Sequence, residues 1–350
     1  MRPLGPALAL AAAALVAPAA AAQGESVWSS SPAVGLGPVL MRAQSPLAVL
    51  RFSPTPEPPV TLDPGQWQVD MLTSWCNYFD VDPALYTIDA ESLRFSLHAA
   101  YGFAPRFDVK VALPVAYRGG GILDRFITDF EGLLKVPNEA RKQAPRNRYL
   151  ILIRGQNGQT YERSGGDAGW GIEDATVSLR YQLAKGTATK PAITLSGGVK
   201  VPTGRQASLY SSGGYDVAAG VSLGQRLGRF NLYASAFAMH YATTELVGVR
   251  LTSTQNSLFA GLEFRKSART SWVLQALRTS PGAEHFGGLS RNSYEVTVGF
   301  KRVLRPSLLL EASLLENLFI FDNSPDVGFH VGIVWRSPRA GGRPASAPVY

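Results

Sequence analysis

The ten residues Ala192–Val201, AITLSGGVKV, alternate between two kinds of side chain. Ile193 and every second residue after it are apolar or glycine, and the positions between them hold Thr194, Ser196, Gly198 and Lys200. A period of two places successive side chains on opposite faces of a β-strand. The same alternation recurs over Phe107–Tyr117, Ala175–Leu183, Tyr294–Lys301 and Val327–Arg336. The chain after Gly65 is therefore predicted to form strands with one apolar face.

Two all-β architectures produce this alternation. In a soluble sandwich the apolar faces pack together, whereas in an outer-membrane barrel they contact lipid and the polar faces line the interior. The length of the runs favours the barrel, because a tilted membrane crossing takes about 9–11 residues and an ordinary strand about 5–6. Twelve strands are predicted, at 66–77, 91–102, 106–117, 172–183, 191–202, 214–224, 229–241, 255–265, 271–278, 292–302, 307–318 and 326–336.

The links between these strands also favour the barrel. Short links such as 102–107 and 266–270 alternate with long connections such as 118–171 and 242–254. Outer-membrane barrels have short periplasmic turns and longer extracellular loops, and aromatic residues at both membrane interfaces. Six aromatic residues lie near predicted strand ends: Trp67, Trp75, Tyr117, Tyr241, Trp272 and Trp335. The predicted fold class is an antiparallel transmembrane β-barrel of about 12 strands, spanning 65–336.

The amino terminus predicts export. Residues 1–22 contain a charge at Arg2, an apolar run over Leu4–Val16 and the small residues Ala20–Ala22, which is the layout of a cleaved secretory signal. The apolar run is shorter than the roughly 20 residues of a membrane-spanning helix. The predicted location is the cell outer membrane of a Gram-negative bacterium.

Composition limits the partners. Charged residues make up 17% of the chain, below the roughly 25% of ordinary globular domains. The net charge of +8 is spread without a Lys/Arg run, which favours anionic outer-membrane lipid and lipopolysaccharide as partners and disfavours nucleic acid. Cys76 is the single cysteine, so an intrachain disulfide is excluded. The sequence leaves the oligomeric state open.

The long connection 118–171 carries a predicted helix and a predicted hairpin. Apolar residues over 122–134 repeat at spacings of three and four, which indicates an amphipathic helix. Tyr149–Arg154 and Thr160–Arg163 flank a Gly-containing link and indicate a β-hairpin. The helix is predicted to close the barrel mouth as a lid, with the outer leaflet as the alternative location. The lid residues would be Ile122, Phe126, Phe130 and Leu133.

Two segments flank the barrel. Residues 23–64 contain eight prolines and no clear strand alternation, and they carry apolar patches at Val39–Met41 and Leu47–Leu50. They are predicted to be a periplasmic segment or a plug inside the barrel. Residues 337–350 form a predicted C-terminal tail, which departs from barrels that end on an aromatic strand residue.

Several blocks of the chain resemble one family. They are GPVLMRAQSPLAVLRFSPTPE (37–57), the helix and loop block 119–149, GWGIEDATVSLRYQL (169–183), VKVPTG (199–204) and SPDVGFHVGI (324–333). These blocks are similar to the uncharacterised exported proteins grouped as domain of unknown function thirty-one eighty-seven. The resemblance implies an outer-membrane-type β-barrel and supplies no catalytic residue.

Charged residues on the polar faces are the candidate functional residues. By parity the lumen-facing candidates are Arg94, His98, Lys110, Arg180, Lys200, Glu263, Arg265, Glu295, Lys301 and Glu311. They are interpreted either as an ion-pair network that fills a narrow lumen or as a polar pathway for small solutes. A twelve-stranded barrel is intermediate in width, so side chains or a plug decide whether it conducts.

Motifs for catalysis are weak. Gly220–Gly224, GVSLG, matches a nucleophile elbow, but that motif needs a strand followed by a turn and a helix, and here it lies within a predicted strand. The four histidines lack close ligand spacing. The sequence therefore predicts no enzyme and no cofactor. The leading hypothesis is a passive channel or transporter for small or partly apolar molecules; the alternatives are a closed structural or interaction barrel and a membrane-embedded lipid-modifying hydrolase.

Overall fold

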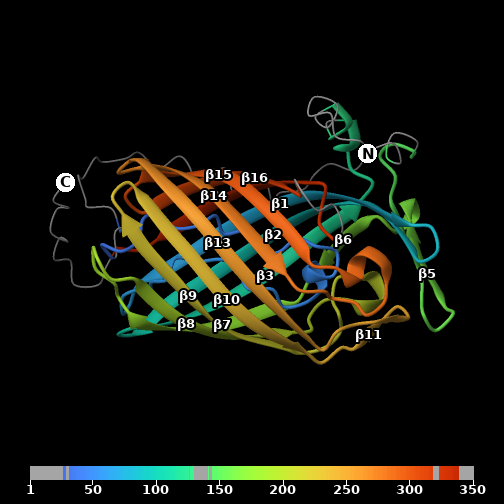
Figure 1. Cartoon of the computed structure of the whole chain (residues 1–350), viewed down its shortest axis with the longest axis horizontal. Helices are drawn as coiled ribbons and strands as arrows, with labels where there is room; N and C mark the ends of the chain where they lie inside the picture. Colours follow the sequence, from blue (N-terminus) through green and yellow to red (C-terminus); the bar gives the residue numbers. More distant parts are fainter. Residues whose placement is uncertain are drawn as a thin grey trace.

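The computed structural model describes residues 27–28, 31–125, 127–129, 141, 144–317 and 323–338. Within them, twelve antiparallel strands pair with their neighbours in chain order, and β1 pairs with β17 to close a barrel (Figure 1). The wall strands are β1 (Trp67–Asp82), β2 (Tyr86–Ala104), β3 (Phe107–Gly119), β7 (Ala175–Ala184), β8 (Ala192–Val201), β9 (Asp216–Leu227), β10 (Phe230–Tyr241), β13 (Thr254–Ser267), β14 (Thr270–Thr279), β15 (Ser293–Arg305), β16 (Leu308–Glu316) and β17 (Val327–Arg336). The predicted 12-stranded barrel is confirmed.

The wall is apolar outside and polar inside. On β3, Val111 and Leu113 are 38% and 55% exposed, while Asp108 and Lys110 on the other face are 0% and 6% exposed. A soluble protein of this size would bury the apolar face, so this distribution fits a barrel whose outer face contacts lipid. None of the helices in the described residues is long and apolar enough to cross a membrane.

The two ends of the barrel differ. At the turn end, the links are 105–106, 185–191, 228–229, 268–269 and 306–307. At the loop end, the connections 120–174, 202–215, 242–253, 280–292 and 317–326 are longer. One connection is shorter than predicted: β1 and β2 continue to Asp82 and from Tyr86, so three residues join them where the sequence predicted a loop over 78–90.

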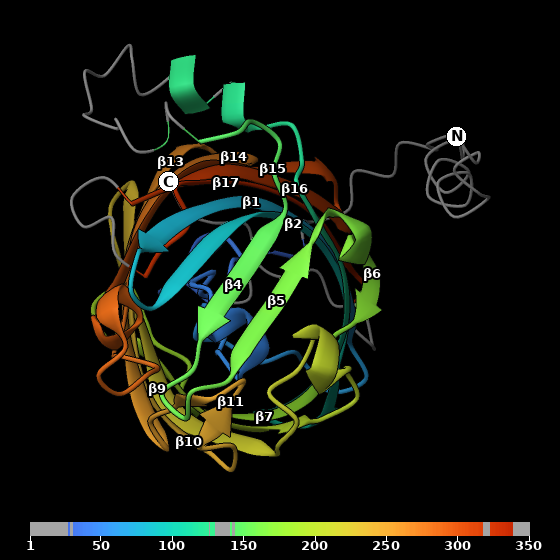
Figure 2. The same cartoon turned by 90° about the vertical axis from the view of Figure 1, so that its right-hand side faces the viewer.

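A hairpin covers the loop end. It consists of β4 (Leu150–Arg154) and β5 (Thr160–Ser164), and β4 pairs with the extended start of β2. The hairpin lies across the barrel mouth in the end view (Figure 2). Ile151 and Ile153 are buried there in an apolar cluster with residues of β1 and β2 and of the short hairpin β11 (Glu245–Leu246) and β12 (Val249–Arg250).

The start of the predicted lid helix lies on the outer wall. Asp124, Arg125 and Ile127–Asp129 are helical. Leu123 and Ile127 pack against Val327 and Phe329 of β17 and Trp75 of β1. These three wall residues point outward. Ile122 is 69% exposed, and Phe126, Phe130 and Leu133 lie outside the described residues. The described part of this segment therefore contacts the side of the barrel, where apolar wall residues receive Leu123 and Ile127, and the mouth is covered by β4–β5.

Aromatic residues gather near both ends of the outer face. Trp67, Trp272 and Trp335 are exposed at the turn end, and Trp170 stacks on Phe95 towards the loop end. This arrangement matches the interfacial girdles of outer-membrane barrels. The prediction for Tyr241 is wrong, because this residue is 2% exposed and its hydroxyl donates to Phe52 O inside the lumen. Its odd position on β10 is an inward one, like that of Tyr233.

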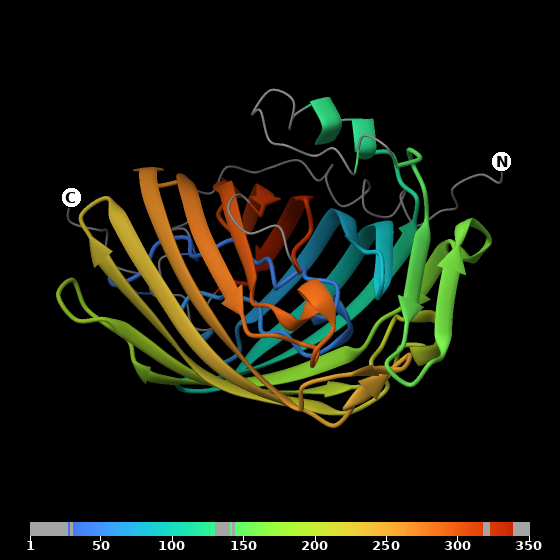
Figure 3. The same ribbon diagram turned by 45° about the vertical axis from the view of Figure 1, so that its right-hand side comes forward.

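Residues 31–64, called here the lumen segment, run inside the barrel (Figures 2 and 3). Leu36 and Leu40 pack with Val334 and Leu309 of the wall, and the short 3-10 helix η1 (Ala48–Leu50) reaches the apolar cluster of the loop end. The segment then returns to the turn end, where the N–H of Gly65 donates to Gly102 O before β1 begins. Its only regular element is η1, so its backbone polar groups need other partners.

Candidate functional site in the barrel lumen

Side chains of the wall bind the backbone of the lumen segment. Eight backbone N–H groups of the segment donate to acidic or amide side chains on seven different wall strands, over 2.8–3.2 Å. The pairs are Leu36 and Gly37 with Glu263, Val39 with Gln275, Leu40 with Glu311, Gln44 with Glu295, Phe52 with Asp216, Thr61 with Gln182, and Leu62 with Asp108. The lumen side chains thus replace the hydrogen bonds that a strand or helix would have given the segment.

Glu263 on β13 shows how closely the segment fits. Its carboxylate accepts from Leu36 N at 2.9 Å, Gly37 N at 3.2 Å, the Tyr233 hydroxyl at 2.6 Å and the Ser271 hydroxyl at 2.5 Å. A Cβ at Gly35 would lie 2.3 Å from the carboxylate, so only glycine allows this approach. Glu263 is 0% exposed, and hydrogen-bond donors replace its hydration.

A second wall cluster holds the first arm of the segment. Glu311 is 0% exposed and accepts from Leu40 N at 3.0 Å, while Lys301 Nζ lies 2.9 Å from its other oxygen. His330 Nε2 lies 2.9 Å from Glu311 Oε1. Lys301 also donates to Pro38 O at 2.6 Å, so the cluster binds both an N–H and a carbonyl of the segment.

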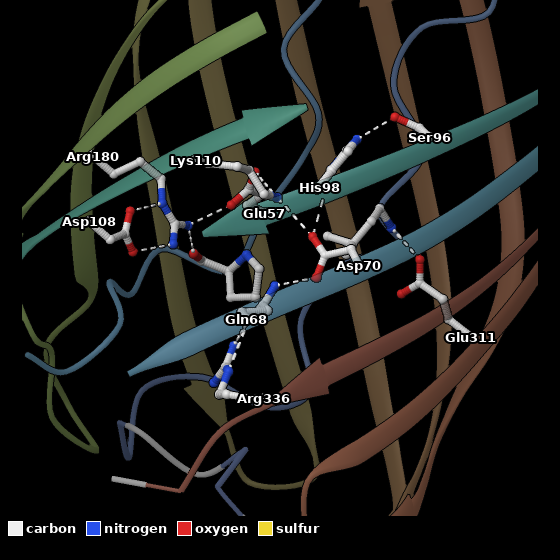
Figure 4. A network of polar contacts seen from close by, with 12 residues as sticks. Glu57, Gln68, Asp70, Ser96, His98, Asp108, Lys110, Arg180, Glu311 and Arg336 are labelled. Atoms are coloured by element: carbon white, nitrogen blue, oxygen red, sulfur yellow. Dashed lines mark hydrogen bonds and ion pairs between the residues drawn. The ribbon is translucent and has the colours of Figure 1, made fainter. Parts of the chain in front are cut away.

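The second arm is held by Glu57, as Figure 4 shows. Its carboxylate lies 2.8 Å from Lys110 Nζ and 2.7 Å from Arg180 Nη1. Lys110 also lies 3.1 Å from Asp70, and Arg180 makes two bonds of 2.8 and 2.6 Å with Asp108. Burial would raise the pKa of Glu57, but the cations Lys110 and Arg180 hold it below its ordinary value. Glu57 is therefore ionised at neutral pH and ties the segment to β3 and β7.

A third network lies beside the loop end. Arg94 Nε lies 2.6 Å from Glu173, and Arg118 lies 3.1 Å from the other oxygen of the same carboxylate. Lys200 pairs with Asp174 and lies 3.3 Å from Asp216. Glu173 and Asp174 are consecutive and both buried, between β6 (Gly169–Ile172) and β7. This interruption of the alternation turns two carboxylates into the lumen.

Most of the predicted lumen candidates lie in these networks. His98 Nδ1 lies 3.7 Å from Asp70 of the Glu57 cluster, and its Nε2 lies 2.7 Å from the hydroxyl of Ser96. Arg265 differs, because it lies partly exposed at the end of β13 beside a register shift. Glu57, Glu173, Asp174 and Asp216 were not among the candidates. Glu57 could have been found as the one charge within the proline run PTPEPP. Glu173 and Asp174 could have been found as two adjacent acids in an alternating strand.

Several cavities remain beside the lumen segment, and two of them adjoin its apex. A polar one has a volume of about 70 Å³ and is lined by cationic, hydroxyl and glycine residues of β2, β3, β7 and β8, and by residues between Phe52 and Pro58. Arg42 also lines it and donates to the carbonyls of Ala48 and Arg51. Burial and the charge of Arg94 lower the pKa of Arg42 to about 10, so it stays protonated at neutral pH. The other cavity is apolar and lies at the loop end.

Closed twelve-stranded topology, an apolar outer face and a charged lumen define an outer-membrane-type β-barrel. The chain belongs to the family described as "Protein of unknown function (DUF3187)", whose model matches residues 20–337. This confirms the family resemblance. No curated protein matches the chain.

A solved channel structure shows the same fold. An outer membrane channel from Pseudomonas putida F1 superposes with a TM-score of 0.55 at 12% identity, covering 79% of this chain and 97% of that chain. The NanC porin superposes with a TM-score of 0.45 at 8% identity, covering 76% of this chain and 98% of that one. At these identities the likeness to the Pseudomonas channel concerns the fold alone.

Proposed function

We propose that the protein is a passive outer-membrane channel for small or partly apolar solutes, closed at rest by the lumen segment acting as a plug. After export with cleavage after Ala22, the long loops would lie outside the cell and the short turns in the periplasm, as in other outer-membrane barrels. The channel fold and the charged lumen support this function. The observation that carries the proposal is that the segment is held by side chains, and by no strand pairing, on every side of the lumen.

The apex of the plug separates the two cavities. Leu50 lines the apolar cavity, and Phe52 lines the polar one. Between them, Arg51 donates to Thr243 O at 2.9 Å and Gly282 O at 3.3 Å, and its guanidinium lies 4.2 Å from the centre of the Tyr241 ring. Movement of this apex would join the cavities into one path, so Arg51 is the proposed latch.

Planar-bilayer conductance of the full chain and of an Arg51→Ala variant tests the proposal. We expect rare, brief openings for the wild type and a clear rise in open probability for Arg51→Ala. Arg154→Ala, which removes an exposed arginine of the hairpin, serves as the matched control and should behave as wild type. A barrel that carries no current in any of these forms, nor after deletion of 23–57, would show that the lumen is closed and structural.

A further inference from the structure

The apolar cavity at the loop end is formed by parts that are distant in sequence. The plug apex contributes Leu47, Val49 and Leu50, and the hairpin β4–β5 contributes Ile151 and Ile153. The extended ends of β1 and β2 and the hairpin β11–β12 form further walls, together with Arg118, Leu209, Leu251 and Leu289. The cavity has a volume of about 80 Å³, several times the roughly 10–15 Å³ that one water molecule needs, so it has room for a small molecule.

The charged groups beside this cavity are already engaged. Arg118 lies 3.1 Å from Glu173, donates to Leu209 O and lies over the Tyr210 ring at 4.7 Å. Glu91 accepts from Trp75 Nε1 at 2.7 Å and from Leu123 N at 2.5 Å. Neither group needs a ligand of opposite charge, so the cavity favours an uncharged molecule.

One polar group is left over. Tyr78 lines the cavity and is 6% exposed, and its buried hydroxyl makes no hydrogen bond of normal geometry among the described residues, its contact with the Cys76 thiol being a weak one. A buried hydroxyl without a partner destabilises a folded protein, and a ligand oxygen can supply the missing bond. The hydroxyl can either donate to a carbonyl or ether oxygen or accept from a ligand hydroxyl.

We propose that this cavity binds a small, uncharged, mainly apolar molecule that carries one hydrogen-bonding oxygen, such as a phenol. The apolar walls take the ring or short chain, and Tyr78 binds the oxygen. Because Leu47–Leu50 of the plug apex form part of the wall, the bound molecule contacts the element that has to move for conduction. The inference deepens the proposed function, since it names the class of solute received at the loop end.

Two matched probes test the site. 4-Fluorophenol and 4-fluorotoluene have nearly the same size and differ in one hydroxyl, and their binding to the full chain in lipid nanodiscs can be followed by ¹⁹F NMR. We expect saturable binding of both probes, and at least tenfold weaker binding of both to Val249→Trp, which fills the cavity. Leu113→Trp, at a lipid-facing position with 55% exposure, is the control for partition into lipid and should bind as wild type.

Tyr78→Phe tests the chemical class. We expect the ratio of 4-fluorophenol affinity to 4-fluorotoluene affinity to fall by roughly five- to tenfold, the loss of one buried hydrogen bond. An unchanged ratio would overturn the role of the ligand oxygen. Equal binding to Val249→Trp and Leu113→Trp, or no saturation above empty nanodiscs, would overturn the site. Conductance of the same proteins in planar bilayers tests the channel separately. Saturable binding to a barrel that carries no current would reject the channel and leave the binding site standing.

Discussion

Replacing Glu263 by Gln should release the first arm of the plug. In the wild type one carboxylate accepts two backbone N–H groups of the lumen segment and two hydroxyls of the wall. The amide keeps the shape and one acceptor oxygen, but it presents an NH₂ donor where the second oxygen accepted. One N–H of the segment therefore loses its partner, and the other loses a charged acceptor.

The size of the effect follows from the two bonds at Leu36 and Gly37. A hydrogen bond to a charged group contributes about 1.5–3 kcal/mol net, and a neutral one about 0.5–1.5 kcal/mol. Losing one and weakening the other costs about 2–4 kcal/mol of docking free energy, or roughly a 30- to 700-fold shift towards the undocked segment. Both N–H groups regain water when the segment leaves, so the cost falls on the docked state alone.

Two measurements detect this shift. Open probability in planar bilayers should rise for Glu263→Gln, and the amides of Leu36 and Gly37 should exchange faster with deuterium than in the wild type. Glu284→Gln makes the same chemical change at an exposed position of the loop end and should alter neither quantity. Unchanged exchange at these two amides in Glu263→Gln would refute the assignment of Glu263 as an anchor of the plug.

Two further predictions follow from the contacts of the segment and of the outer wall. The pKa of Glu57 is lowered, so its contribution to docking is complete above its ordinary value of 4.5 and is lost as pH falls through the lowered pKa. Conductance should therefore rise as pH falls below about 4.5, and Glu57→Gln, already weakened at pH 7, should lack this part of the rise; identical pH profiles would contradict the assignment. Ile127→Ser should lower thermal stability through lost contacts on the outer wall and leave conductance unchanged, whereas raised conductance would restore the lid hypothesis for the helix.

The wall of the barrel could be predicted because each strand carries its own signal. A strand that divides lipid from lumen must alternate, so Ala192–Val201 reveals its two faces without knowledge of its neighbours. The parity of such strands also identified Lys110, Arg180 and Glu311 as lumen residues. Parity misled at Arg265, where a register shift ends the alternation of β13, and nearness to a strand end misled at Tyr241, which points into the lumen.

The plug and the lid could not be predicted with the same detail. The lumen segment has no periodic pattern because its hydrogen bonds go to side chains from distant strands, and no local rule pairs Gln44 with Glu295 or Phe52 with Asp216. The amphipathic pattern of 122–134 identified an apolar face but not the surface that buries it. The outer wall offers apolar residues such as Val327 and Phe329, and an apolar barrel mouth would bury the helix equally well. The amphipathic pattern alone therefore cannot choose between the outer wall and the mouth.

Because side chains hold the lumen segment, it could undock from the lumen without disrupting the strand pairing of the barrel. The backbone N–H and C=O groups of the twelve wall strands pair between neighbouring strands around a closed ring. The lumen segment adds no strand to this ring. Undocking therefore breaks no ladder hydrogen bond, and it exposes carboxylates and amides that water can solvate. A segment inserted as a strand would instead leave two unpaired edges in the membrane, which lipid cannot satisfy. On the proposed function, the anchoring side chains would make the plug removable, and substitutions there should separate channel opening from barrel folding.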